Sequence, residues 1–383
     1  MRIGVNTRLF VKGKMDGIAW YAYEVLRRMV MSHPEHEFVF FFDRLYLEEF
    51  VFEKNVKPVV LHPQARHPLL WRYFFEVSLK RALVREKVDL FFSPEGFVCL
   101  SSKVPTVNII HDINFEHFPE FLQKSHRRYY QKYFPLYAQR SDTLTTVSEF
   151  CKQDIAETYQ LPADKIEVAG NAAAEDFFPL SEAERQAVRN EWTEGKPFFV
   201  FVGTINRRKN VIHQLMAYDD FREAGHEAKF VFVGSKKHWN SEMGHCLQNM
   251  RHASDVVFTN YISTTDLNRI LASACALMYV SSFEGFGVPI LEAFAAETPV
   301  ITASVTAMPE VAGDAALLVH PDDVPGISAA MQRVFTDMEL RGRLVEKGRL
   351  RQRSFSWDST ADILWRIIEK QYYSSNLNHD EKQ

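Results

Sequence analysis

The sequence has few cysteines and no long apolar run, and each absence argues against a class of protein. Its four cysteines, Cys99, Cys151, Cys246 and Cys275, form no C-x-x-C pair, which argues against a thiolate zinc site and a disulfide framework. No run approaches the ~20 apolar residues that a helix needs to cross a bilayer. The N-terminus turns polar after a few residues, so we expect no secretory signal and a cytoplasmic location, either free or at the inner face of the cell membrane.

The charge balance and several missing motifs argue against further classes of ligand and catalytic site. With 45 Lys and Arg against 49 Asp and Glu, the chain has no global cationic field, so we predict no nucleic-acid partner. No two Asp residues have the spacing D-x-D of a metal–nucleotide site, and we predict neither a metal nor a cofactor. The motifs G-x-x-x-x-G-K, H-E-x-x-H, G-x-S-x-G and G-x-G-x-x-G are also missing, which argues against the sites that they build.

The length of 383 residues suggests two domains of roughly 100–200 residues each. Short apolar runs rich in Val, Ile and Phe alternate with helix-like segments, which is typical of a parallel sheet covered by helices on both faces. The first series of predicted strands is Arg2–Asn6, Phe38–Phe42, Val59–Leu61, Leu90–Ser93, Thr106–Ile110, Thr143–Val147 and Ile166–Val168. The second series is Phe198–Val202, Lys229–Val233, Val256–Phe258, Ala276–Val280, Val300–Thr302 and Ala316–Val319.

A polar helix separates the two series of strands. Ser181 and Glu184 have the spacing of a capping box at its start. We therefore predict an α/β chain with one doubly wound domain at 1–180, a second at 181–356, and a final amphipathic helix at 357–374. Two such domains would place the carboxyl ends of both sheets at a shared cleft, where open α/β sheets bind ligands.

The strongest local signal is the segment SSFEGFGVPILE, which follows a predicted strand. Its two glycines precede Pro289, which suits the start of a helix whose backbone N–H groups can bind a phosphate. Glu284 lies in the loop and Glu292 in the helix, so both carboxylates can face one ligand. Because carboxylates repel a diphosphate, we expect them to contact the hydroxyls of a sugar and a ribose; the alternative is an ordinary capped helix with acidic residues.

Three further features suit a polar ligand. Three consecutive cations, ending in Arg208 and Lys209, follow the first strand of the second series and indicate either a phosphate clamp or a solvated loop. Gly17 lies at the start of the predicted helix after the first strand, where backbone N–H groups can bind an anion. His111 and Asp112 lie at the end of a predicted strand. They indicate either a polar contact to a ligand in the cleft or a His-Asp pair that only stabilises the fold.

Two stretches rich in aromatic and basic residues, 69–87 and 124–140, allow two interpretations. Each predicts either an amphipathic surface that rests on an anionic membrane or a helix packed on the first sheet with its cations extended to solvent. The 31 Phe residues likewise indicate either an apolar surface or apolar strands. Many fall in predicted strands, as in Phe38–Phe42, so buried strands account for part of the excess.

These residues resemble the retaining family 4 glycosyltransferases of the GT-B fold, and the resemblance covers almost the full chain. Glu284 and Glu292, within FEGFGVPILEA, are similar to the E-x7-E motif of that family. The supporting segments, in the family's order, are Asp16-Gly17-Ile18, His111–Pro119, Thr146–Phe150, Asn171, Phe177–Pro179, Gly203-Thr204, Arg208-Lys209-Asn210, Pro309–Asp314 and Phe355-Ser356-Trp357. Two positions depart from the pattern: Ala172, where a Gly usually follows the Asn, and Thr204, where some members have an Arg.

The resemblance implies a role for each matching residue. Arg208 and Lys209 would hold the donor diphosphate, and His111 would contact the sugar near the reacting carbon. Glu284 would contact the donor sugar and Glu292 the ribose. The residues that it assigns to donor binding are Gly17, Gly203, Thr204, Arg208, Lys209, Tyr261, Ile262, Glu284, Gly285, Phe286, Gly287, Val288 and Glu292, with Tyr261 and Ile262 at the base. The catalytic set is His111, Glu284, Arg208 and Lys209, and the acceptor-side residues are Asp112 and Asn171.

The resemblance also implies that the final helix, which starts near Trp357, crosses back to the first domain. It further implies a retaining hexosyltransferase that takes a sugar nucleotide and needs no metal. The segments HDINFEHFPE and VSEF are most similar to mannosyl- and rhamnosyl-transferring members that build bacterial surface polysaccharides. We therefore predict GDP-mannose as the donor and a glycan or lipid-linked molecule as the acceptor. Two alternatives stay open: a GT-B-fold sugar-nucleotide epimerase or phosphorylase, and a non-catalytic protein that binds sugar nucleotides.

Overall fold

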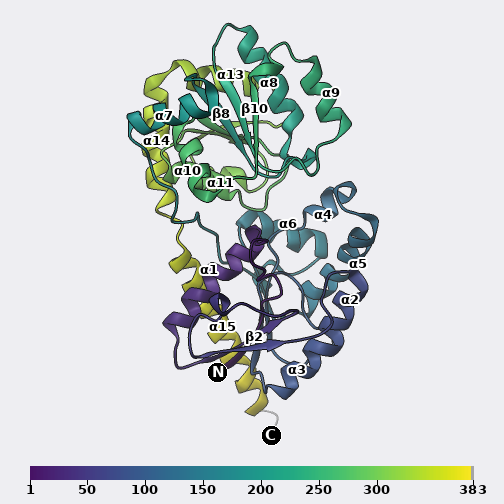
Figure 1. Ribbon diagram of the computed structural model, residues 1–383. Coiled ribbons are helices and arrows are strands. Elements are labelled where there is room, and N and C mark those ends of the chain that lie inside the picture. The colour runs from purple at the N-terminus through teal and green to yellow at the C-terminus, as the bar shows by residue number, and fades with distance from the viewer. Residues whose placement is uncertain (381–383) are drawn as a thin grey trace. The chain divides into compact units, whose positions relative to one another are not determined.

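The computed structural model describes residues 1–380, which form two compact units (Figure 1). Unit 1 contains Met1–Asn171 and the chain from Trp357 onward, and unit 2 contains Ala172–Ser356. The predicted boundary at 180 differs because the segment after Asn171 packs on unit 2. Phe177 is buried, and the backbone N–H of Phe178 donates to Oδ1 of Asn268, 3.1 Å away.

Unit 1 is built on a parallel sheet of seven strands in the order β3-β2-β1-β4-β5-β6-β7. The strands are β1 Arg2–Asn6, β2 Glu37–Phe42, β3 Val56–Val60, β4 Leu90–Ser93, β5 Thr106–Ile109, β6 Thr143–Thr146 and β7 Ile166–Val168. They confirm all seven predicted strands, with small differences at the ends. Phe38, Phe40, Phe41 and Phe42 of β2 are all buried, because helices cover both faces of a parallel sheet. Buried strands thus account for part of the phenylalanine excess.

The helices of unit 1 follow the strands in the βα order that the sequence predicts. Its α-helices are α1 Gly17–Ser32, α2 Pro68–Tyr73, α3 Lys80–Arg85, α4 Asn114–His117, α5 Lys124–Arg140, α6 Glu149–Tyr159 and α15 Trp357–Asp380. Its shorter turns are η1 Glu48–Phe50, η3 Pro119–Phe121 and η4 Ala163–Lys165, and a π-helical stretch, η2 Phe74–Leu79, joins α2 to α3.

The final helix, α15, belongs to unit 1, as the sequence predicts. It packs along α1, where Asp358 accepts a hydrogen bond from Nε of Arg28 at 2.6 Å. The ring of Trp365 stacks on His33 with 3.6 Å between ring centroids. Among residues 1–380, no helix is long and apolar enough to cross a bilayer.

Unit 2 is built on a second parallel sheet, with six strands in the order β10-β9-β8-β11-β12-β13. The strands are β8 Phe198–Val202, β9 Lys229–Val233, β10 Val256–Asn260, β11 Ala276–Tyr279, β12 Val300–Ala303 and β13 Ala316–Val319. The helices and turns are α7 Glu182–Thr193, η5 Arg207–Lys209, α8 Val211–Glu223, α9 Ser241–Asn249, η6 Ala253–Asp255, α10 Thr264–Ser273, α11 Val288–Ala295, α12 Met308–Ala312, α13 Val324–Thr336 and α14 Met338–Gln352. The predicted capping box of Ser181 and Glu184 is confirmed at the start of α7.

Candidate functional site

The strand order of unit 2 brings its two predicted donor motifs together. β8 and β11 are hydrogen-bonded neighbours, and the order of the strands along the chain reverses between them. Ligands of open α/β sheets bind at the carboxyl ends of the strands at such a switch point. The loop with Arg208 and Lys209 follows β8, and the loop with Glu284 follows β11, so both motifs lie at the switch point.

The Glu284 carboxylate is held between two cations. Its Oε2 lies 2.9 Å from Nη1 of Arg208, and its Oε1 lies 2.7 Å from Nζ of Lys209. The Glu284 and Lys209 side chains are only 9% and 10% exposed, against 19% for Arg208. Arg208 also donates to the carbonyl of Phe283 at 2.6 Å, which ties the two loops together.

The environment of Glu284 keeps its carboxyl ionised. Burial tends to raise the pKa of Glu284, but the positive charges of Lys209 and Arg208 outweigh it and lower the pKa to about 2. An ionised carboxylate that is paired on both oxygens fixes the positions of both cations. The site therefore presents one negative and two positive charges in a fixed arrangement before any ligand arrives.

The loop after β8 places the two cations by local hydrogen bonds. Asn206 caps the short turn η5, because its Oδ1 accepts from the backbone N–H of Lys209 at 3.1 Å. Gly203 begins the loop with φ of +138°, a conformation that favours glycine. A Cβ on Gly234 of the next loop would lie 2.0 Å from the carbonyl oxygen of Gly203, so this close approach also requires glycine. Thr204, which follows Gly203, is exposed.

Tyr279, the last residue of β11, is a site residue that the sequence analysis missed. Nζ of Lys209 donates to its hydroxyl at 2.8 Å and also lies 4.6 Å from the centre of its ring. Burial raises the pKa of Tyr279 well above its usual value, so its hydroxyl stays protonated. The negative charges of Glu284 and Glu292, the two carboxylates of the E-x7-E motif, add to this rise in the pKa of Tyr279.

The helix that carries Glu292 starts at a glycine, as the motif predicts. Gly287 is the N-cap of α11 with φ of +106°, and a proline occupies the first turn. The Phe286 ring is buried against Phe355, with the ring centroids 5.7 Å apart. Gly285 lies between this ring and Glu284 along the chain. Val288, the first residue of α11, and Glu292 are intermediate in exposure, and burial raises the pKa of Glu292 to about 7.

The residues assigned to the base lie farther along the sheet. Tyr261 and Ile262 follow β10, the edge strand, and β9 separates that strand from β8. The Tyr261 side chain is 89% exposed. The geometry of unit 2 therefore does not bring them to the ion pairs at the switch point, and their contact with a base stays a prediction.

Four predicted residues lie in unit 1. His111 follows β5, and its Nε2 lies 2.9 Å from the carbonyl oxygen of Pro94. Burial lowers the pKa of His111, so the imidazole is neutral, donates from Nε2 and keeps Nδ1 as an acceptor. Gly17 is the first residue of α1, and Asn171 is buried at the end of the unit.

Asp112 has a local structural contact. Its Oδ1 accepts hydrogen bonds from the backbone N–H of Asn114 at 3.0 Å and from the Asn114 side chain at 2.5 Å. This contact stabilises the turn that starts α4. The role of Asp112 toward an acceptor stays a prediction.

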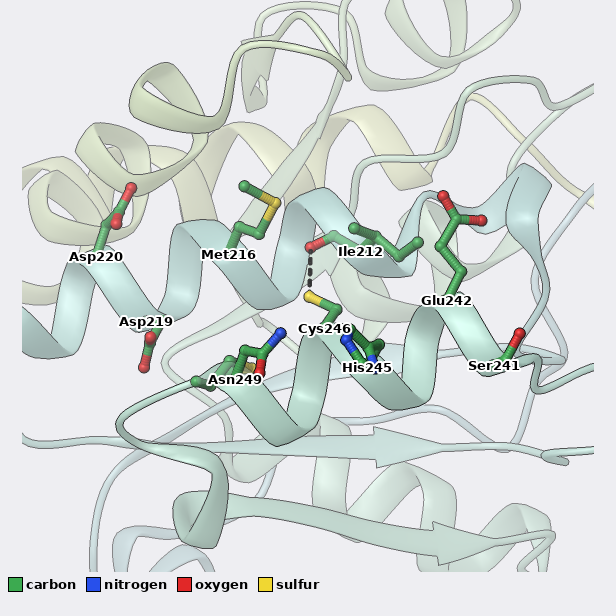
Figure 2. A pocket seen from close by; sticks show the side chains of 10 residues that line it. Ile212, Met216, Asp219, Asp220, Ser241, Glu242, His245, Cys246 and Asn249 are labelled. Carbon is green, nitrogen blue, oxygen red and sulfur yellow. Dashed lines mark hydrogen bonds between the residues drawn. The ribbon is translucent and has the colours of Figure 1, made fainter.

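A groove of about 650 Å³ lies elsewhere on unit 2, between α8 and α9 (Figure 2). Ile212 and Met216 line it from α8, and His245 and Cys246 line it from α9. The Cys246 thiol donates to the carbonyl of Ile212 at 3.9 Å and links the two helices. None of the predicted donor residues lines this groove. In the described part of the chain, no three His, Cys, Asp or Glu side chains form a group that could hold a metal.

The raised pKa of Glu292 predicts that the free energy of unfolding depends on pH. The unfolded carboxyl titrates near 4.5 and the folded one near 7, so between these values the folded state binds more protons. The free energy of unfolding of the wild type should therefore fall, relative to Glu292→Gln, as the pH rises from 5 to 8. Urea unfolding at both pH values measures this, with exposed Glu227→Gln of the same unit as the control. An equal stability difference at both pH values would contradict the assignment.

Comparisons with known proteins cover both units. The family model described as "Glycosyltransferase Family 4" matches residues 15–176, and the one described as "Glycosyl transferases group 1" matches residues 182–351. O-antigen chain mannosyltransferase B of Escherichia coli is 26% identical over 360 residues, which are 91% of this chain and 94% of the relative. O-antigen chain mannosyltransferase RfbU of Salmonella typhimurium is 27% identical over 274 residues, which are 70% of this chain and 71% of the relative.

A solved structure supports the same fold. HepE of Anabaena, in complex with UDP and glucose, matches with a TM-score of 0.74 at 13% identity, covering 97% of this chain and 100% of HepE. The likeness concerns the fold alone. With a group 1 match on unit 2, a family 4 match on unit 1 and two Rossmann-like sheets, the chain belongs to the family 4 glycosyltransferases, retaining enzymes of the GT-B fold that use nucleotide sugars.

Proposed function

We propose that this glycosyltransferase transfers mannose from GDP-mannose, with retention of the anomeric configuration, to a glycan or lipid-linked acceptor in surface polysaccharide synthesis. The observation that carries the proposal is the buried arrangement of Glu284, Arg208 and Lys209 at the switch point of unit 2. The cytoplasm is the proposed location, and four free thiols fit a reducing compartment.

The two cations suit a diphosphate leaving group. When the bond between the sugar C1 and the phosphate oxygen breaks, its electron pair stays on that oxygen and negative charge develops there. Preorganised positive groups at that point lower the barrier, because they need no reorganisation during the reaction. Arg208 and Lys209 are preorganised in this sense by Glu284 and by the hydrogen bond from Lys209 to Tyr279. We infer that they stabilise the leaving group without a metal ion.

Retention fits a transfer on one face of the sugar. In our proposal the acceptor hydroxyl attacks C1 from the side of the departing diphosphate, and its proton passes to a phosphate oxygen. The new C1–oxygen bond forms as the old one breaks, and no protein nucleophile takes part. Neutral His111 would accept a hydrogen bond from a sugar hydroxyl at Nδ1, and Glu292 would bind the ribose hydroxyls.

The donor assignment rests on relatives. Two of them are named O-antigen chain mannosyltransferases, whereas HepE, the structural neighbour, was solved with UDP and glucose. These names support mannose and leave UDP-glucose as the competitor to test. An epimerase or phosphorylase would change or split the sugar nucleotide without an acceptor, and a binding protein would give no product at all.

Loss of a site charge should reduce turnover strongly. We expect Lys209→Ala and Glu284→Ala to lower kcat/KM by about 10²–10³-fold, the loss typical of removing one preorganised transition-state contact. Lys347→Ala, which removes a cation from an exposed ion pair with Asp314, is the matched control. Transfer assays with purified variants measure this, and near-normal activity of both site variants would contradict the proposed site.

The Tyr279 hydroxyl should act as a positioning group for Lys209. We expect Tyr279→Phe to lower kcat/KM by about 10- to 100-fold, because a hydrogen bond to a charged group contributes ~1.5–3 kcal/mol. Tyr218→Phe is the control, since its buried hydroxyl donates to the carbonyl of Ala228, away from the site. Both variants lose a tyrosine hydroxyl that accepts a hydrogen bond from a cation, Lys209 for Tyr279 and Arg222 for Tyr218, so a merely structural role would affect both alike. Equal kinetics for the two variants would contradict the positioning role.

A panel of sugar nucleotides should identify the donor. A ligand that binds only the native state stabilises it by about 2.7 kcal/mol at a hundred times its Kd. We therefore expect GDP-mannose to raise the melting temperature more than UDP-glucose at equal concentration, with or without EDTA. A larger shift with UDP-glucose would overturn the mannose assignment, and a shift that requires Mn²⁺ would contradict metal independence.

A further inference from the structure

We propose that Tyr21 of α1 is a positioning residue for His111. Its ring sets the plane of the imidazole, and so the direction in which Nδ1 of His111 accepts a hydrogen bond. The ring of Trp357, the first residue of α15, supports Tyr21 in turn. All three residues belong to unit 1. The inference rests on the proposed function in one respect, the contact of His111 with the donor sugar.

His111 is hydrogen-bonded at one ring atom, which leaves its ring plane loosely defined. That bond joins Nε2 to the carbonyl oxygen of Pro94 at 2.9 Å. The ring turns about the bond between Cβ and Cγ, and Nε2 lies closer to the axis of this bond than Nδ1 does. Torsions of this kind have broad minima in histidine. A restraint at Nε2 alone would therefore let Nδ1 swing, and Nδ1 is the atom that the proposed mechanism uses.

The Tyr21 ring supplies a second restraint. Its centroid lies 4.7 Å from that of the His111 imidazole, and the two ring planes are 89° apart. Aromatic rings prefer such an edge-to-face arrangement, because the positive edge of one ring meets the negative face of the other. Turning the imidazole would disturb this arrangement. Together with the hydrogen bond to Pro94, the ring contact fixes the direction of Nδ1.

Tyr21 is itself held firmly. It lies on the buried face of α1, one helical turn after Gly17, and its side chain is 1% exposed. The buried ring of Trp357 packs against it with 5.6 Å between centroids and 75° between planes. Because α15 packs along α1 (Figure 1), the last helix of the chain supports the ring that orients His111.

The ring of Tyr21, and not its hydroxyl, has this role. Within residues 1–380 the buried hydroxyl has no hydrogen-bond partner, and neither has Nε1 of Trp357. Burial raises the pKa of Tyr21, so the phenol carries no charge either. A buried hydroxyl without a partner lowers stability. Phenylalanine at position 21 should therefore keep the positioning contact and lose nothing that the fold needs.

NMR titration of the histidine side chains tests the positioning without catalysis, and the spectrum of His111→Gln identifies the signal. Burial lowers the pKa of His111, although the charges of Asp112 and Asp16 act to raise it. Tyr21→Leu should admit water beside the imidazole, raise its pKa and weaken the preference for one tautomer. Tyr21→Phe should leave both unchanged.

The matched control is Phe38→Leu. Like Tyr21, Phe38 is a buried ring of unit 1 beside a tryptophan of α15, in this case Trp365 at 6.3 Å between centroids. It lies near the start of β2, whereas His111 follows the carboxyl end of β5, so the two lie at opposite edges of the parallel sheet. The control should lose stability and leave the His111 signal unchanged.

Kinetics tests the effect on transfer. We expect Tyr21→Leu to lower kcat about tenfold, the effect of one hydrogen bond, with the KM of the donor nearly unchanged because unit 2 binds the diphosphate. Tyr21→Phe and Phe38→Leu should keep a kcat close to that of the wild type. In a His111→Gln background the loss from Tyr21→Leu should vanish, since a positioning residue acts only through its partner.

Three outcomes would overturn the positioning role: an unchanged His111 signal in Tyr21→Leu, an equal loss of kcat in Tyr21→Phe, or a loss of the same size in the His111→Gln background. If Tyr21→Leu fails to fold, Trp357→Leu, which removes the support of the Tyr21 ring, gives the same test. Normal activity of His111→Gln alone would count against the proposed contact with the sugar. The NMR signal of His111 would still decide the positioning role.

Discussion

The donor site depends on one buried carboxylate, Glu284, held between Arg208 and Lys209. Taking these charges out of water is costly, and only close pairing with further hydrogen bonds compensates for it. The pairing exists because two strands, β8 and β11, are neighbours in the sheet although a long stretch of chain separates them. The sheet, the close approach of Gly234 to Gly203 at the start of the β8 loop, and the buried Tyr279 all serve to hold these three charges in place.

The two carboxylates of the E-x7-E motif show how position sets chemistry. Glu284 lies beside two cations, so its pKa is about 2 and it stays ionised. Burial instead raises the pKa of Glu292 to about 7. One acts as a fixed anion that orders cations, and the other can exchange a proton near neutral pH. The charges of both carboxylates raise the pKa of the Tyr279 hydroxyl, so both act on the electrostatics of the same residue of unit 2.

The sequence predicted much of this arrangement, for physical reasons that also explain what it missed. The strands were predictable because buried parallel strands are continuous apolar runs. The capping box was predictable because both of its residues, Ser181 and Glu184, lie within one turn of the chain. The contact of Tyr279 with Lys209 was not predictable, because it depends on the pairing of β8 with β11. The local sequence of neither strand specifies its partner. The aromatic stretches were ambiguous because one helix, such as that of Trp71, buries one face and exposes the other. The acceptor-side roles of Asp112 and Asn171 stay predictions.

The central claim, that the cations paired with Glu284 bind the donor diphosphate, is tested most directly by calorimetric titration of GDP and UDP. If Arg208 and Lys209 receive the phosphates, Glu284 competes with the nucleotide for them. Glu284→Gln should then bind the preferred nucleotide at least as tightly as the wild type, even though it turns over poorly. Clearly weaker binding of both nucleotides by Glu284→Gln would contradict the account.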